Sequence, residues 1–87
     1  MIDYEGFSKA LGKLHEEEAL RLAHEFINSD PNEEEEKLFM KAAQNGIDTV
    51  AEQFEMRKYS VGELIYAKEI LSQIMDMILP KMHAVES

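Results

Sequence analysis

The sequence predicts an all-α fold, a four-helix bundle in which neighbouring helices run antiparallel. Apolar residues recur at helical spacing along most of the chain, and only two prolines and four glycines interrupt its 87 residues. Hydrophobic residues make up 45% of the sequence, which suits packed helices better than disorder or sheet. A chain of this length forms one domain with a small core.

The first third of the chain predicts two short helices. In the range 4–14, Phe7, Leu11 and Leu14 follow the i, i+4, i+7 spacing of one helix face, although two glycines weaken the helix. In the range 15–28, one face is apolar and three glutamates stand near the start. Negative charge there is favoured by the positive end of the helix dipole, so an amphipathic helix is expected.

A third helix is predicted over residues 33–56. Asn32 followed by Glu35 resembles a capping box at its start. The acidic run Glu33–Glu36 is expected to be a solvated helix start stabilised by the dipole. Gly46 stands in the interior and costs about 1 kcal/mol relative to alanine. Either the helix bends there, or something approaches its backbone closely.

A fourth helix is predicted over residues 61–79. Ser60 and Glu63 have the spacing of a capping box, and Pro80 disfavours helical geometry for the residue before it. The predicted core of the whole bundle consists of Phe26, Phe39, Ala43, Val50, Phe54, Leu64, Leu71 and Ile78.

The fourth helix is apolar around most of its circumference. A peripheral helix of a small bundle needs an apolar face of only about 100–140°, so this helix has more apolar surface than it needs. Three explanations remain open at this point. The helix is central in the bundle, it pairs across a homodimer, or a ligand or second domain lies against it.

Charge and composition exclude several classes of function. Nine Lys and Arg stand against 18 Asp and Glu, a net charge of −9, which repels nucleic acid and anionic membranes. The chain has no cysteine, so it forms no disulfide, and nothing in the sequence indicates an oxidising compartment. No apolar stretch is long enough to span a bilayer and the N-terminus does not resemble a signal peptide, so a cytoplasmic location is expected.

Catalytic motifs are missing from the sequence. None of His15, His24 and His83 belongs to a His-Glu-x-x-His zinc motif, and no phosphate-binding loop, dinucleotide-binding turn or nucleophile elbow occurs. We therefore expect no catalytic residue, no metal site and no enzymatic activity of the chain's own.

Two segments nevertheless carry a specific pattern. Residues 46–54, Gly-Ile-Asp-Thr-Val-Ala-Glu-Gln-Phe, precede residues 59–67, Tyr-Ser-Val-Gly-Glu-Leu-Ile-Tyr-Ala. This half of the chain resembles the N-terminal helical cap domain of cobalamin-dependent methyltransferases and corrinoid proteins, the methionine synthase cap family. The first half resembles the family only in having two short amphipathic helices.

Four positions depart from the family pattern. Ala51 replaces a usual glycine, Arg57 stands where a turn glycine is common, and Gly62 replaces a frequent proline. Ser60 occupies the position at which many members place an aromatic residue over the cobalt face, and it is also explained as a helix N-cap.

The resemblance implies a methionine synthase cap-like bundle that sits on the upper face of a cobalamin cofactor. Such a cap shields the cobalt during methyl transfer and swings aside for a methyltransferase subunit. Family position and the apolar excess of the fourth helix together suggest the cofactor-facing residues. They are Ser60, Val61, Leu64, Ala67 and Ile70, with Gly46 allowing close approach.

The family's Asp-x-His-x-x-Gly motif, which supplies the lower cobalt ligand, does not occur in the chain. The cofactor would therefore be held mainly by a domain absent from this chain. We expect residues 1–80 to form the cap and residues 81–87 to be a linker to a following, doubly wound corrinoid-binding domain.

A different class of function stays open beside this one. An acidic helical module could use the same wide apolar face for protein interaction or dimerisation and never meet a corrinoid. A small enzyme is a third option, opposed by the missing motifs. Sequence beyond Ser87 would discriminate the first two most cheaply.

Overall fold

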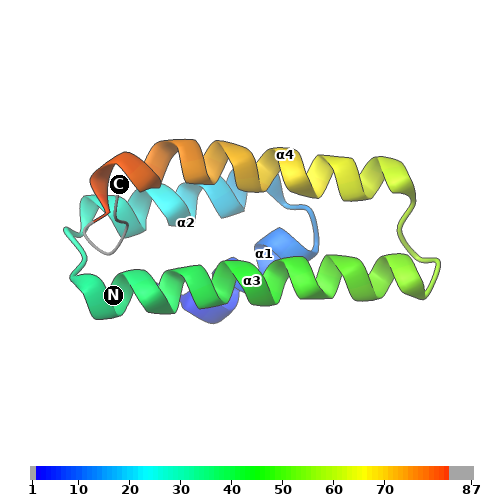
Figure 1. Ribbon diagram of the computed structural model, residues 1–87, viewed down its shortest axis with the longest axis horizontal. Helices are drawn as coiled ribbons and strands as arrows, with labels where there is room; N and C mark the ends of the chain where they lie inside the picture. The colour runs from blue at the N-terminus through cyan, green and yellow to red at the C-terminus, as the bar shows by residue number, and fades with distance from the viewer. Residues whose placement is uncertain (1, 83–87) are drawn as a thin grey trace.

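The computed structural model describes residues 2–82, which form four α-helices and no strand. The helices are α1 (Tyr4–Gly12), α2 (Glu16–Asn28), α3 (Glu33–Glu55) and α4 (Val61–Ile78), followed by a short 3₁₀ turn, Leu79–Lys81 (Figure 1). The all-α prediction is confirmed. Each predicted helix boundary lies within two residues of the observed one.

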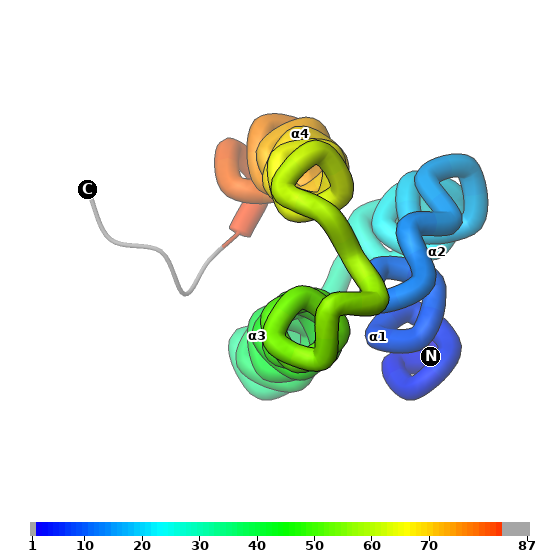
Figure 2. Tube along the Cα trace, turned by 90° about the vertical axis from the view of Figure 1, so that its right-hand side faces the viewer, coloured from blue at the N-terminus to red at the C-terminus, as the bar shows by residue number. Residues whose placement is uncertain are grey.

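The two long helices, α3 and α4, run in opposite directions, and α1 and α2 lie beside them (Figures 1 and 2). Consecutive helices are antiparallel, as predicted. The closest packing, however, is between α1 and α3, which run parallel. Their register shows this, since Tyr4 contacts Glu35 and Ser8 contacts Ala42.

Both predicted capping boxes are present. The Glu35 amide donates to Asn32 Oδ1 at 2.8 Å, and the Asn32 amide donates to Glu35 Oε1 at 2.9 Å. The Ser60 amide donates to Glu63 Oε1 at 2.7 Å, and the Glu63 amide donates to Ser60 Oγ at 3.3 Å. Because these bonds involve residues three positions apart, the sequence alone was sufficient to predict them.

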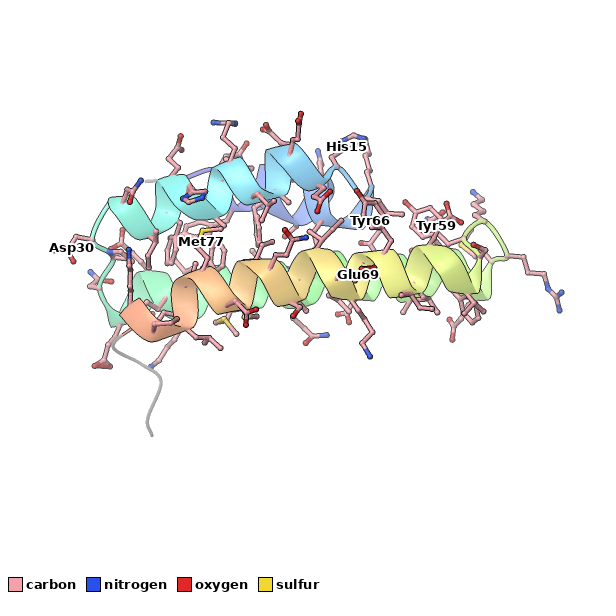
Figure 3. The ribbon with its side chains drawn as sticks, turned by 90° about the horizontal axis from the view of Figure 1, so that it is seen from above. His15, Asp30, Tyr59, Tyr66, Glu69 and Met77 are labelled. Carbon is pink, nitrogen blue, oxygen red and sulfur yellow. The ribbon has the colours of Figure 1, made fainter. Side chains whose placement is uncertain are left out.

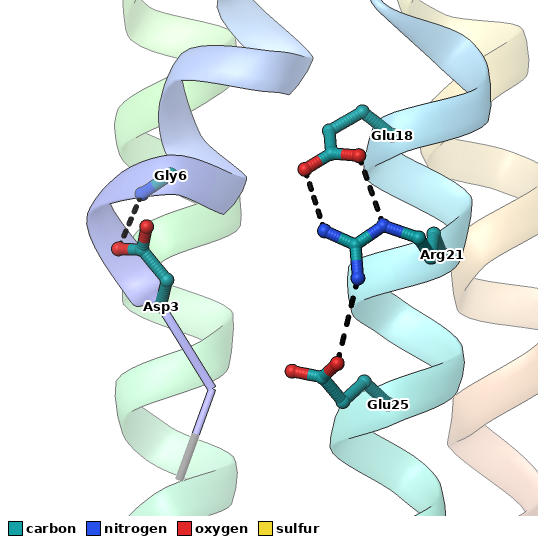
Figure 4. A network of polar contacts seen from close by, with 5 residues as sticks. All are labelled: Asp3, Gly6, Glu18, Arg21 and Glu25. Atoms are coloured by element: carbon teal, nitrogen blue, oxygen red, sulfur yellow. Dashed lines mark hydrogen bonds and ion pairs between the residues drawn. The ribbon is translucent and has the colours of Figure 1, made fainter.

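The first two helices have local polar contacts of their own (Figure 4). The Gly6 amide donates to Asp3 Oδ1 at 2.8 Å, which caps α1. On the surface of α2, Arg21 pairs with Glu18 at 2.7 Å and with Glu25 at 3.5 Å. The hydrogen bond from Arg21 lowers the pKa of Glu18.

The first three helices each end next to a residue with positive φ that is not glycine. Leu14, Asp30 and Arg57 have φ of 62°, 56° and 63°. At the end of α3, the Lys58 amide donates to the Gln53 carbonyl at 2.8 Å, as in a Schellman motif. Glycine adopts this conformation at lower cost, so Arg57 carries a local strain.

Three stacked aromatic rings hold the first three helices together. Phe39 of α3 stacks on Phe7 of α1 at a centroid distance of 4.4 Å and on Phe26 of α2 at 4.3 Å. The contribution of α4 to the core is aliphatic and consists of Ala67, Ile70, Ile74 and Ile78. The core therefore has two parts: α1, α2 and α3 supply its aromatic rings, and α4 supplies aliphatic side chains.

Five of the eight predicted core residues are buried: Phe26, Phe39, Ala43, Val50 and Ile78. The prediction was wrong for Phe54, which is 38% exposed, and Leu64 and Leu71 are only half-buried. The reason is the unequal length of the helices. The end of α3 that carries Phe54 and the start of α4 project beyond α1 and α2, so no third helix covers them (Figure 1).

The interior glycine of α3 allows α1 to approach closely. A β-carbon at Gly46 would lie 2.9 Å from Cβ of Leu11 and 3.0 Å from the carbonyl oxygen of Ser8. Beside it, Ser8 Oγ donates to the Ala42 carbonyl at 2.7 Å. Of the two explanations considered for Gly46, close approach is therefore shown, and the approaching group is α1.

The acidic start of α3 is not solvated throughout. Glu33 and Glu34 are exposed and Glu35 completes a capping box, but Glu36 is fully buried. Glu36 lies one turn before the core residue Phe39, on the same face of the helix. The expectation of a fully solvated run was wrong at this one position.

The packed unit includes Met82, which is 9% exposed and belongs to the core, although the linker was expected to begin at residue 81. The rest of that predicted linker, with His83, lies outside the described residues. Within residues 2–82, no helix is both long and apolar enough to cross a membrane.

Candidate functional site

The structure separates the six residues expected to face a cofactor into two groups. Ser60 and Val61 are exposed at the start of α4, Val61 by 60%, and Leu64 is half-buried one turn later. The other three, Gly46, Ala67 and Ile70, are buried. In this arrangement they offer no surface to a ligand, because Gly46 is covered by α1 and the other two point into the bundle's own core.

The first turns of α4 are exposed, and its later turns are covered by α2. The Tyr66 hydroxyl donates to Glu16 Oε1 at 3.0 Å, and Gln73 Nε2 donates to Glu16 Oε2 at 2.7 Å. Figure 3 shows Tyr66 reaching from α4 toward the start of α2 beside His15. The hydrogen bond to Glu16, together with burial, raises the pKa of Tyr66. From this point onward α2 lies against α4 and covers it.

Before that point, exposed apolar side chains gather at one end of the bundle. We call this end the α3–α4 tip and define it by Phe54, Met56, Val61 and Ile65, which are 38%, 54%, 60% and 55% exposed. They come from the last turn of α3, the turn that follows it and the first turns of α4. Large apolar groups concentrated at one end of a small domain indicate a contact surface.

A tyrosine fixes the turn inside this tip. The Tyr59 hydroxyl donates to the carbonyl oxygen of Gly12 at 2.8 Å, and the side chain is half-buried. The bond joins residues 47 positions apart and connects the start of α4 to the end of α1. Ser60 and Val61, which follow directly, are thereby held in a defined position relative to the rest of the bundle.

Within residues 2–82, no group of three or more histidine, cysteine, aspartate or glutamate side chains could hold a metal ion. The candidate site is the α3–α4 tip, whose exposed groups are mainly apolar side chains.

A family model described as the B12 binding domain matches residues 4–79. The chain belongs to this family of cobalamin caps. The match includes all four helices, so the first half of the chain, which the resemblance supported only weakly, is part of the same domain. Caps of this family are accessory, non-catalytic modules of cobalamin proteins. No solved structure matches the chain significantly.

The residues of this cap domain fit one face of a corrinoid. A corrin ring offers a broad face, and the α3–α4 tip offers exposed aromatic, thioether and aliphatic groups at the end of a rigid bundle.

Sequence reasoning missed Phe54, Met56 and Ile65 as surface residues. Phe54 continues the apolar stripe of α3, so periodicity placed it in the core. A usable signal existed in the unequal helix lengths, because the short predicted helices at 4–14 and 15–28 cannot cover the full length of a helix at 33–56.

Proposed function

We propose that this cap domain covers the upper face of a corrinoid cofactor during methyl transfer between a methyltransferase and an acceptor. The family match over all four helices carries the proposal, and the exposed α3–α4 tip supports it. The cofactor would be held mainly by a separate, doubly wound corrinoid-binding domain, since the chain has no Asp-x-His-x-x-Gly motif. That domain and a methyltransferase subunit are the proposed partners.

The surface proposed to face the ring consists of Ser60, Val61 and Leu64, joined by Phe54 of α3. When bound, the corrinoid supplies the cobalt that carries the methyl group, and the cap supplies cover and orientation. Val61 and Phe54 would exclude water from the upper face with apolar surface. Ala67 and Ile70 would act indirectly. They would pack in the core behind Leu64 and so fix the orientation of α4 relative to the other helices.

The methyl group must be reached by a partner enzyme, so the cap must be able to move away. The stacked phenylalanines join α1, α2 and α3, and the buried isoleucines of α4 belong to the same core, so the four helices form one body. We propose that the cap moves as a unit, which keeps its own core intact while the ring is uncovered.

One observation favours the alternative, an acidic interaction or dimerisation module. Between α3 and α4 runs a shallow groove of 120 Å³ with mostly apolar walls, among them Met40, Ile47, Leu71 and Met75. A second copy or another protein could bind along it. Sedimentation over a range of concentrations tests this, because a dimer through the groove would be disrupted by Ile47→Glu.

The capping proposal is tested with this domain joined to a corrinoid-binding domain and loaded with cofactor. Val61→Glu places a charge on the proposed cofactor-facing surface. Ser72→Glu is the matched control, since Ser72 is exposed on the same side of α4 about three turns later. The oxidation rate of the reduced cofactor is followed by absorbance, and the stability of the bundle by circular dichroism.

We expect faster oxidation for Val61→Glu and no change for Ser72→Glu, with both bundles folded. Equal oxidation rates for both variants and the parent protein would contradict the proposed surface. Ala67→Glu is unsuitable for this test, because Ala67 is 1% exposed and the substitution would disrupt the core.

A further inference from the structure

The α3–α4 tip contains a hollow, and the capping proposal uses only Phe54 of its lining residues. It has a volume of 440 Å³ and is lined by Phe54, Glu55, Arg57 and Tyr59. Its walls come from the end of α3 and from the turn that leads into α4. We call it the tip hollow. It lies directly beside Val61 and Ser60 in the chain, at the end of the bundle proposed to meet the corrin ring.

Two opposite charges line the tip hollow without pairing. Glu55 and Arg57 are both exposed. Within the part of the chain that the structure describes, neither side chain forms an ion pair or a hydrogen bond. A strong acceptor and a strong donor thus both line the tip hollow and are available to a third group.

Arg57 stands at the left-handed position that ends α3. Its φ of 63° is a conformation that glycine adopts more easily. The chain carries a guanidinium at this position in spite of the strain. Leu14 and Asp30 have the same conformation after α1 and α2, so this φ belongs to the end of the helix, and the proposal rests on the tip hollow and its two charges.

We propose that the tip hollow binds a primary carboxamide group of the corrinoid, one of the acetamide side chains that project from the upper face of the ring. The Arg57 guanidinium donates to the carboxamide oxygen, and the Glu55 carboxylate accepts from its NH₂ group. The ring of Phe54 packs against the adjoining apolar edge. This inference rests on the proposed function and adds to it a contact that fixes the rotation of the cap about the ring.

The chemistry of the hollow selects a carboxamide over related groups. A carboxylate would be attracted by Arg57 but repelled by Glu55, and an amine would be repelled by Arg57. A carboxamide alone among these has a donor and an acceptor on the same planar group, matching both walls.

The test uses the 87-residue chain, which has its own core, and follows its NMR signals during titration with dicyanocobinamide. This corrinoid keeps the ring and its acetamides but lacks the nucleotide phosphate, to which an arginine could also bind. We expect the signals of Ser60 and Val61 to shift, together with those of Glu55 and Arg57.

Arg57→Gly removes the guanidinium while relieving the backbone strain, so the variant should remain folded. Its affinity for dicyanocobinamide should fall about three- to tenfold, the loss expected for one hydrogen bond at an accessible site. Lys58→Ala is the matched control. Lys58 is the adjacent exposed cation and does not line the hollow, so its removal should leave the affinity unchanged.

Shifts at Ser60 and Val61 with equal affinities for Arg57→Gly and the parent chain would overturn the carboxamide contact and leave the proposed function standing. A loss in Arg57→Gly seen with cyanocobalamin but not with dicyanocobinamide would overturn it too, because Arg57 would then bind the phosphate. If no signal moves at all, the contact is overturned, and the oxidation experiment with Val61→Glu decides the proposed function separately.

Discussion

The Tyr59 hydroxyl donates a hydrogen bond of 2.8 Å to the carbonyl oxygen of Gly12. Gly12 is the last residue of α1, where a helix carbonyl has no partner within its own helix. The tyrosine satisfies this carbonyl and at the same time anchors the turn that carries Arg57 and Ser60. One contact thus connects the stability of the short helix α1 with the position of the α3–α4 tip.

Tyr59→Phe removes this hydrogen bond and leaves the ring in place. We expect a loss of about 1 kcal/mol in the free energy of unfolding, the usual contribution of one such bond. Urea titration measures it. Tyr66→Phe is the control, since Tyr66 donates to an exposed carboxylate that water can also solvate. A loss in Tyr59→Phe no larger than in the control would show that the bond contributes little.

The exposure of Phe54 predicts a difference between two phenylalanines of the same helix. Phe39→Ala should destabilise the domain by roughly 3–5 kcal/mol, because the ring is fully buried in the aromatic stack. Phe54→Ala should cost less than about 1.5 kcal/mol, since the ring is 38% exposed. Comparable losses in denaturant titration would mean that Phe54 is packed more tightly in solution.

Two glycines should respond to alanine with opposite signs. Gly46→Ala adds a methyl group 2.9 Å from Cβ of Leu11, so it should destabilise by about 1–3 kcal/mol in spite of alanine's higher helix propensity. Gly62→Ala meets no atom closer than 3.6 Å and should stabilise by about 0.5–1 kcal/mol. Thermal unfolding distinguishes the two. A stabilised Gly46→Ala would contradict the close approach of α1.

The left-handed backbone of Arg57 predicts that Arg57→Gly stabilises the domain by about 1 kcal/mol, because glycine adopts this φ without a steric cost. Glu52→Gly is the control, a glycine placed inside α3 on its exposed face, and it should destabilise by about 1 kcal/mol. Chemical denaturation of both variants gives the comparison. Destabilisation in Arg57→Gly would indicate that the arginine has stabilising contacts in the turn.

The contact between Arg21 and Glu18 predicts how the stability of the folded domain changes with pH. The pKa of Glu18 is lowered in the folded state by its hydrogen bond to Arg21, so its stabilising contribution is present above the unfolded-state pKa and is lost as pH falls through the folded-state pKa. Arg21→Gln should raise the Glu18 pKa, which an NMR titration of the carboxyl carbon measures directly. An unchanged pKa would mean that the contact is not populated in solution.

Much of the fold could be predicted from the sequence because the signals are local. The capping boxes at Asn32 and Ser60 lie within one turn of helix, and apolar periodicity identifies each helix without knowledge of its partners. The segments around Gly46 and Tyr59 were sufficient to recognise the family, which the match over residues 4–79 confirms.

Other features depend on which segments meet, and periodicity cannot determine that. The sequence could show that Gly46 allows a close approach, but only the packing of α1 shows that Leu11 and Ser8 make it. Ala67 and Ile70 belong to apolar stripes of α4, and whether these face a ligand or the domain's own core is decided by the position of α2.

The sequence by itself determined the helices, their ends and the family, since each follows from residues close together in the chain or from a motif. The tertiary structure decided the exposure of Phe54 and Val61 and the burial of Ala67. Helices of unequal length leave one end of α3 and α4 uncovered, and burial depends on neighbours from distant parts of the chain rather than on the side chain's own polarity.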